Sequence, residues 1–162
     1  MTVLRLALAL SLLAGAASAA PDDDLPPREI AGPVEARVLK VRDGDTVEVE
    51  AYVWPLQTVT VAVRLRNVDA PELRGKCEEE KAAARRARER LAELVGEGSV
   101  TIRHISGDKY FGRVLAEMGS AAAPDLGAVL LREGLVDAYD GGRRRDWCAP
   151  AVGSLRNLFG RG

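Results

Sequence analysis

Two pairs of carboxylates lie at predicted turns of this chain. Asp43 and Asp45 are separated by one glycine, and Asp69 and Glu72 are separated by an Ala-Pro dipeptide. If the fold brings the two turns together, their oxygen atoms offer the ligands that a hard cation such as Ca²⁺ prefers. Each pair alone also has a simpler interpretation, because an Asp-Gly dipeptide often only forms a turn and the second pair could only cap a helix.

Two arginines accompany these carboxylates. Arg64 lies on a predicted strand shortly before Glu72, and Arg113 directly follows a glycine. A cation, a carboxylate and guanidinium groups together suit phosphodiester hydrolysis, because the transition state gains negative charge on the phosphate oxygens. A carboxylate within reach of a water molecule can orient it or accept its proton. Arg64, Glu72 and Arg113 are therefore the candidate catalytic residues.

The composition limits the classes of site that the chain can form. Its 162 residues include 23 Lys and Arg against 24 Asp and Glu, so the formal net charge is −1. This balance excludes binding of nucleic acid by bulk positive charge, and any such binding must be local. One His and two Cys exclude His-rich zinc sites and a Cys₄ zinc site. The length suffices for one domain with a hydrophobic core.

Hydrophobic periodicity predicts the elements that position these residues. Apolar side chains alternate in three runs, the first two joined by an Asp-Gly turn, which is typical of a strand meander. A stripe at helical spacing follows, and then two further strand-like runs and a second amphipathic helix between Asp125 and Gly134. The strands are expected at residues 34–41, 47–53, 59–65, 100–105 and 114–118, and the first helix at residues 78–95. This order predicts an α+β, mainly β fold, a five-stranded oligonucleotide/oligosaccharide-binding (OB) barrel with two to three helices.

The two ends of the chain differ from this central region. Residues 1–19 have the charged start, short apolar run and small residues of a secretory signal peptide. Residues 20–33 are acidic and Pro-rich and predict a disordered arm. The folded domain is expected at residues 34–148, with a basic tail at residues 149–162. We therefore expect a secreted or periplasmic protein that is a monomer and has no stable membrane insertion after signal cleavage.

The expected compartment bears on the two cysteines. Cys77 and Cys148 are the only cysteines of the chain. In an oxidising compartment they can form a disulfide. The alternative is two separate buried thiols.

Four segments of the sequence, together with their order, resemble the staphylococcal (micrococcal) nuclease family, also called thermonucleases. The similarity extends from about Val34 to Tyr139, and the spacing from the arginine to the glutamate of the second segment is kept. The segments are Asp43-Gly44-Asp45-Thr46, Arg64-Leu65-x-x-Val68-Asp69-Ala70-Pro71-Glu72, Gly112-Arg113-x-Leu115-Ala116 and Leu126-Gly127-x-x-Leu130-Leu131-x-x-Gly134-Leu135.

The resemblance implies an OB barrel and a Ca²⁺-dependent phosphodiesterase that cuts DNA and RNA and leaves 3′-phosphate ends. Asp45, Asp69 and the backbone carbonyl of Ala70 would hold Ca²⁺. Glu72 would position or deprotonate the attacking water. By the same resemblance, Arg64 and Arg113 would bind the scissile phosphate, so the family and the residue chemistry select the same side chains.

Further implied substrate contacts are Lys109, Tyr110 and Tyr139. Phe111 is an additional residue relative to the family pattern, so whether Lys109 or Tyr110 meets a phosphate stays open. Ala70 replaces a threonine of the founding enzyme, which leaves the carbonyl ligand in place. The alternative function is a catalytically inactive, nuclease-like OB module that binds nucleic acid. The intact set of Arg64, Glu72 and Arg113 favours an active enzyme.

Overall fold

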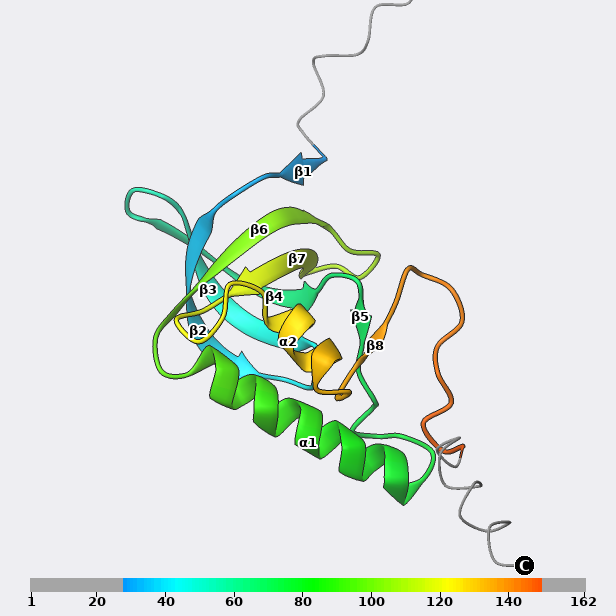
Figure 1. The fold of residues 1–162 in the computed structure, drawn as a ribbon. Coiled ribbons are helices and arrows are strands. Elements are labelled where there is room, and N and C mark those ends of the chain that lie inside the picture. The colour runs from blue at the N-terminus through cyan, green and yellow to red at the C-terminus, as the bar shows by residue number, and fades with distance from the viewer. Residues whose placement is uncertain (1–27, 150–162) are drawn as a thin grey trace, which may run out of the picture.

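A closed β-barrel forms the centre of the computed structural model, which describes residues 28–149 (Figure 1). Strands β2, β3 and β4 form an antiparallel meander, and β4 pairs in parallel with β7. Strand β6 closes the barrel because it pairs with both β7 and β2. The bounds are β2 Val34–Val41, β3 Thr46–Trp54, β4 Gln57–Leu65, β6 Ser99–Gly107 and β7 Arg113–Gly119. The predicted five-stranded OB barrel is confirmed.

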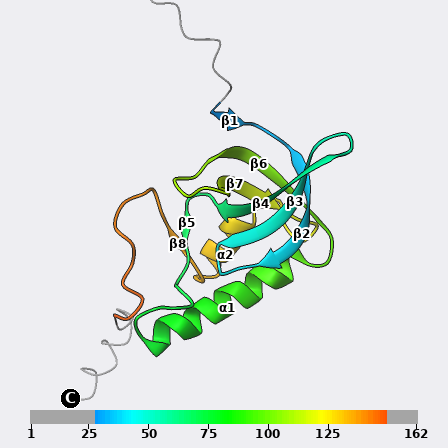
Figure 2. The same cartoon turned by 180° about the vertical axis from the view of Figure 1, so that it is seen from behind.

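Two helices cover the barrel within the described residues, α1 (Glu78–Val95) and α2 (Leu126–Arg132). Figure 2 shows α1 along one end of the barrel, below β2. The first turn of α1 is acidic, as suits the positive end of a helix dipole, and Gly96 ends the helix with φ 60°. The predicted stripe is buried: Ala84, Ala87, Leu91, Leu94 and Val95. Both helix predictions are confirmed, and Asp125 caps α2 as expected.

The hydrophobic core lies inside the barrel and under the two helices. It fills the interior with Val and Ile side chains from several strands, as small barrels require. A register shift between Val38 and Lys40 bends β2, and beyond it Val41 pairs with Val47. This bulge explains why the apolar alternation in the sequence skips a residue between Val38 and Val41.

Three two-residue strands were not predicted from the sequence. Strand β1 (Glu29–Ile30) pairs with β6, so ordered structure begins inside the segment expected to be a disordered arm. Strands β5 (Val68–Asp69) and β8 (Asp137–Ala138) pair with each other outside the barrel. Two residues are too few to show a period-two pattern, so sequence analysis could not find them.

Several predictions concern residues outside the described range. The signal peptide and the basic tail beyond residue 149 belong to this group. Neither helix within residues 28–149 is long and apolar enough to cross a membrane.

Candidate active site

One pocket of about 490 Å³ gathers every catalytic, metal-binding and substrate-binding residue predicted from the sequence. Its walls come from the β2–β3 turn, the end of β4, the loop after β5, the β6–β7 loop and the segment after β8. The predicted residues that line it are Asp45, Arg64, Asp69, Ala70, Glu72, Lys109, Tyr110, Arg113 and Tyr139. The fold thus brings together groups that are widely separated in the sequence.

A guanidinium bridges two buried carboxylates at the base of the pocket. Arg64 Nη2 lies 3.0 Å from Asp45 Oδ2 and 3.2 Å from Asp69 Oδ1. Asp45 and Asp69 are only 6% and 3% exposed. Burial raises the pKa of Asp45 to about 6, and the nearby Asp43 adds to this rise while Arg64 opposes it. Burial therefore disfavours the negative charge of Asp45, and Arg64 balances that effect only in part.

The β2–β3 turn fixes the position of Asp45. Its backbone N–H donates to Asp43 Oδ1 at 3.1 Å, which closes an Asx turn. Its own Oδ2 accepts from the backbone N–H of Ala70 at 3.2 Å, so this carboxylate ties the turn to the loop after β5. Gly44 is required by space, because a Cβ there would lie 2.7 Å from the Cβ of Ala87 in α1.

Arg113, also in the wall of the pocket, is held by two neighbours. Its Nε pairs with the carboxylate of Asp108, whose side chain is only 8% exposed. Its guanidinium lies 4.5 Å from the centre of the Tyr110 ring, and Lys109 Nζ lies 5.2 Å from the same ring. Sequence reasoning assigned no role to Asp108. The signal was present, since Asp108 lies five residues before Arg113 at the other end of a strand-to-strand loop.

Tyr139 lies beside Arg64. Its backbone N–H donates to the Asn67 carbonyl at 2.9 Å, directly after β8 pairs with β5. Its ring centre is 5.8 Å from the Arg64 guanidinium carbon. The short β5–β8 sheet therefore places an aromatic ring at the edge of the pocket.

Arg144 is a second pocket residue that was not identified from the sequence. Its Nε and Nη1 lie 2.8 Å from Asp69 Oδ2 and from Glu72 Oε1, respectively. Its Nη2 donates to the Ala70 carbonyl at 3.0 Å. Partial burial lowers the pKa of Arg144, but the hydrogen bonds that it donates to both carboxylates outweigh this effect and raise the pKa well above its usual value. The sequence places Arg144 in a run of arginines four residues before Cys148, and that cysteine was the available clue.

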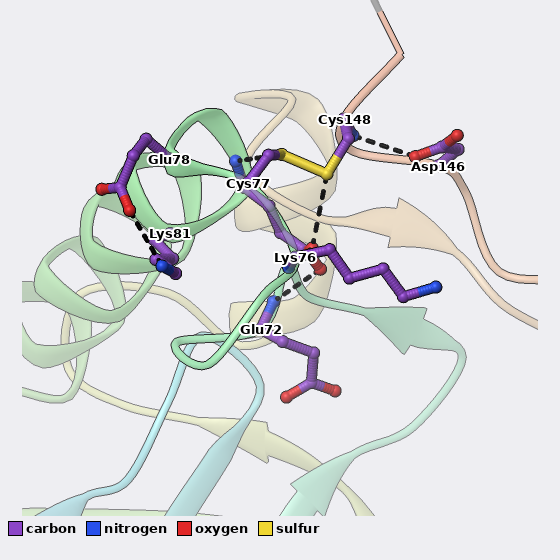
Figure 3. The surroundings of a disulfide bond; sticks show 8 residues. Glu72, Lys76, Cys77, Glu78, Lys81, Asp146 and Cys148 are labelled. Carbon is purple, nitrogen blue, oxygen red and sulfur yellow. Dashed lines mark hydrogen bonds and ion pairs between the residues drawn. A yellow bond between two sulfur atoms is a disulfide. The ribbon is translucent and has the colours of Figure 1, made fainter.

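A disulfide joins Cys77 to Cys148, in agreement with the disulfide expected from the sequence. Figure 3 shows it at the start of α1, where the C-terminal segment meets the helix. Cys77 is also the N-cap of α1, since its Sγ accepts from the backbone N–H of Glu80. The loop bearing Glu72 is attached to the same place, because its backbone N–H donates to Glu80 Oε1 at 3.3 Å.

The oxygen atoms of Asp45, Asp69 and the Ala70 carbonyl are the donors suited to a hard cation. Within residues 28–149, the one group of three His, Cys, Asp or Glu side chains with ligand atoms inside 4.8 Å is Cys77, Glu80 and Cys148. Its two sulfur atoms are bonded to each other, so they are not free thiolate ligands. The carboxylate pocket is accordingly the candidate metal centre.

Comparisons with known proteins give a consistent result. A family model described as staphylococcal nuclease homologue matches residues 62–150. A micrococcal nuclease of Shigella flexneri is 31% identical over 110 residues, which cover 63% of this chain and 56% of that protein. An uncharacterized endonuclease of Escherichia coli is 28% identical over 107 residues, which cover 66% of this chain and 62% of that protein. The chain therefore spans less than two thirds of the length of these curated relatives.

Proposed function

Because the match covers more than half of its 162 residues, the chain belongs to the staphylococcal nuclease family, and we propose that it is a nuclease. The family resemblance seen in the sequence is thereby confirmed. The observation that carries the proposed activity is the placement of Glu72, Arg64 and Arg113 in the wall of one pocket. The proposed substrate is DNA, RNA or both, and the proposed reaction is hydrolysis of the phosphodiester bond.

We propose Ca²⁺ as the metal. The donors fit it, because Asp45, Asp69 and the Ala70 carbonyl offer only oxygen atoms and two of these residues are buried carboxylates. Their negative charge also attracts cations in this structure, since both Arg64 and Arg144 contact Asp69. When bound, a divalent cation supplies positive charge that stabilises the extra negative charge on phosphate in the transition state.

The chain's own residues account for the remaining chemistry. Glu72 is more than half exposed, at 56%, so its carboxylate can reach a water molecule and accept a proton from it. The water oxygen forms a bond to phosphorus as the bond from phosphorus to the 5′ oxygen breaks, which leaves a 3′-phosphate. Arg64 and Arg113 donate hydrogen bonds to the phosphate oxygens and to the departing 5′ oxygen as their charge grows.

Three residues at the pocket edge are proposed to bind the flanking nucleotides. Tyr139 offers a ring for a base, since stacking needs no particular base sequence. Lys109 and Tyr110 lie together next to Arg113, where either can contact a neighbouring phosphate. We further propose that the protein is a secreted or periplasmic monomer, on the strength of the predicted signal peptide alone.

A cleavage assay tests the proposed function. The mature protein is incubated with end-labelled single-stranded DNA or RNA and Ca²⁺, and chelator is added to a parallel reaction. We expect cleavage that chelator stops and products whose 3′ ends lose a phosphate on phosphatase treatment. Glu72→Gln should abolish cutting, while Glu79→Gln, an exposed carboxylate on α1, should leave it unchanged.

Two results would contradict this mechanism. Full activity in Glu72→Gln would exclude Glu72 as the group that acts on the water. Tight binding of the labelled strand by the wild-type protein without any cleavage would instead identify the inactive nucleic-acid-binding module.

A further inference from the structure

Arg144 contacts two of the three groups that the proposed function assigns to the metal, Asp69 and the Ala70 carbonyl, and also the carboxylate of Glu72. Its three nitrogen atoms meet Asp69, Glu72 and the Ala70 carbonyl. Building on that proposed function, we propose that Arg144 is an intramolecular cation that competes with the metal ion for these ligands. The Cys77–Cys148 disulfide holds it there. The contact is autoinhibitory, and the disulfide makes it dependent on redox conditions.

The geometry of these contacts indicates that Arg144 competes with the metal ion for the oxygen atoms and does not merely lie near them. The two carboxylate contacts are both 2.8 Å long and the carbonyl contact is 3.0 Å, so each nitrogen of the guanidinium has its own oxygen partner. Charge-assisted hydrogen bonds of this length are among the stronger ones in proteins. A metal ion on Asp69 and the Ala70 carbonyl would need the same lone pairs. The guanidinium and the metal ion would also repel each other at this distance, which disfavours binding of both at once.

The segment around Arg144 is fastened independently of these contacts. We call residues 140–148 the strap; Figure 1 shows this part of the chain passing from β8 to the start of α1. Arg145 Nη1 lies 3.2 Å from Oδ1 of Asp137, which belongs to β8 and lies outside the strap. The covalent bond from Cys148 to α1 fixes the end of the strap. The backbone of the strap therefore places Arg144 at the pocket.

Glu80 contacts both the disulfide and the loop that carries Glu72. Glu80 accepts from the backbone N–H groups of Glu72 and Lys76 at 3.3 and 2.9 Å, and its Oε2 lies 3.8 Å from Cys148 Sγ. Figure 3 shows the Glu72 carboxylate pointing away from the disulfide, toward the strands. The disulfide thus keeps the strap and the Glu72 loop at one place, which gives the guanidinium a high effective concentration at the carboxylates.

Loss of the disulfide should weaken this hold. Without it, the strap is retained by exposed pairs such as Arg145 with Asp137, and such pairs contribute little. The strap can then open locally and free the carboxylates for metal. Removal of the Arg144 charge should free them more completely.

Titration of Ca²⁺ by calorimetry tests the proposal without measuring nuclease activity. The oxidised mature protein is compared with Arg144→Gln and with Arg143→Gln, a matched loss of one charge. Among the residues that the structure describes, Arg143 has no side-chain hydrogen bond or ion pair. We expect Arg144→Gln to bind Ca²⁺ on the order of tenfold more tightly, a usual size for coupling between sites. Arg143→Gln should match the wild type, and Cys77→Ser/Cys148→Ser should lie between.

Equal or weaker Ca²⁺ binding by Arg144→Gln would overturn the proposal, as would the absence of binding in every variant. A weaker affinity of Arg144→Gln for an oligonucleotide, with unchanged Ca²⁺ affinity, would instead show that Arg144 is a third phosphate ligand and would also overturn it. Failure of the proposed function is distinguishable. In that case the proteins do not cut nucleic acid, yet Arg144→Gln still binds Ca²⁺ more tightly than the wild type.

Discussion

Removal of the Cys77–Cys148 disulfide should lower the free energy of unfolding by about 4 kcal/mol. The two cysteines are 71 positions apart in the sequence. A cross-link over a loop of this length removes about 15 cal/mol/K of chain entropy from the unfolded state, which corresponds to ~4 kcal/mol at 25 °C. Such a loss is a large part of the 5–15 kcal/mol that typically stabilises a single domain.

Urea unfolding of the wild type and of Cys77→Ser/Cys148→Ser at 25 °C measures this difference. With an m-value of about 2 kcal/mol/M, the unfolding midpoint should fall by roughly 2 M. Serine at position 77 keeps an oxygen acceptor for the Glu80 N–H and so preserves the helix cap. The double alanine variant lacks that acceptor and should lose about 1 kcal/mol more.

A loss of less than about 1 kcal/mol in the serine variant, well below the range usual for a native disulfide, would contradict this prediction. So would reduction of the wild type that leaves its unfolding midpoint unchanged while the serine variant is destabilised. In that case the loss would come from the substituted side chains and not from the cross-link.

Three further substitutions probe the site and its supports. Asp45→Asn should raise the stability of the chelator-treated protein at pH 7 and have little effect below pH 4. The folded carboxyl keeps its proton up to about pH 6, so its favourable contribution is complete below its ordinary pKa of 3.8 and is lost as the pH rises through 6. Urea unfolding at the two pH values checks this, and a pH-independent difference would contradict it. Gly44→Ala should cost about 1–3 kcal/mol, because its methyl would overlap Ala87 and Ala70, and thermal unfolding equal to the wild type would refute the overlap. Asp125→Ala should cost about 1 kcal/mol through loss of the α2 cap at 3.0 Å, whereas Asp125→Asn should keep most of it in the same urea assay.

Local patterns in the sequence predicted much of the fold. Helix α1 has the predicted bounds because its apolar stripe, acidic first turn and terminal glycine all agree. The meander of β2, β3 and β4 was likewise predicted from alternation and an Asp-Gly turn. The two-residue strands β1, β5 and β8 were not predicted, because their pairing depends on where the rest of the chain lies and not on their own residues.

The site also contains some residues that the sequence identified and others that only the structure revealed. Asp45, Asp69 and Glu72 were identified because carboxylates at two close turns form a recognisable pattern in a short stretch of sequence. Asp108 was missed although it lies near Arg113, since an acidic residue in a loop is ordinary unless its partner is known. Its pairing became evident only from the geometry of the β6–β7 loop.

The sequence by itself determined the barrel, the family and most of the chemical groups of the pocket, because each depends on residue type and short-range spacing. Only the tertiary structure decided which cation meets those groups. Arg144 lies more than 70 residues from Asp69 and Glu72, and no local pattern relates them. Pairing of β8 with β5 and the Cys77–Cys148 disulfide together bring the Arg144 guanidinium to the carboxylates. An arginine run that resembled an ordinary basic segment is therefore part of the site.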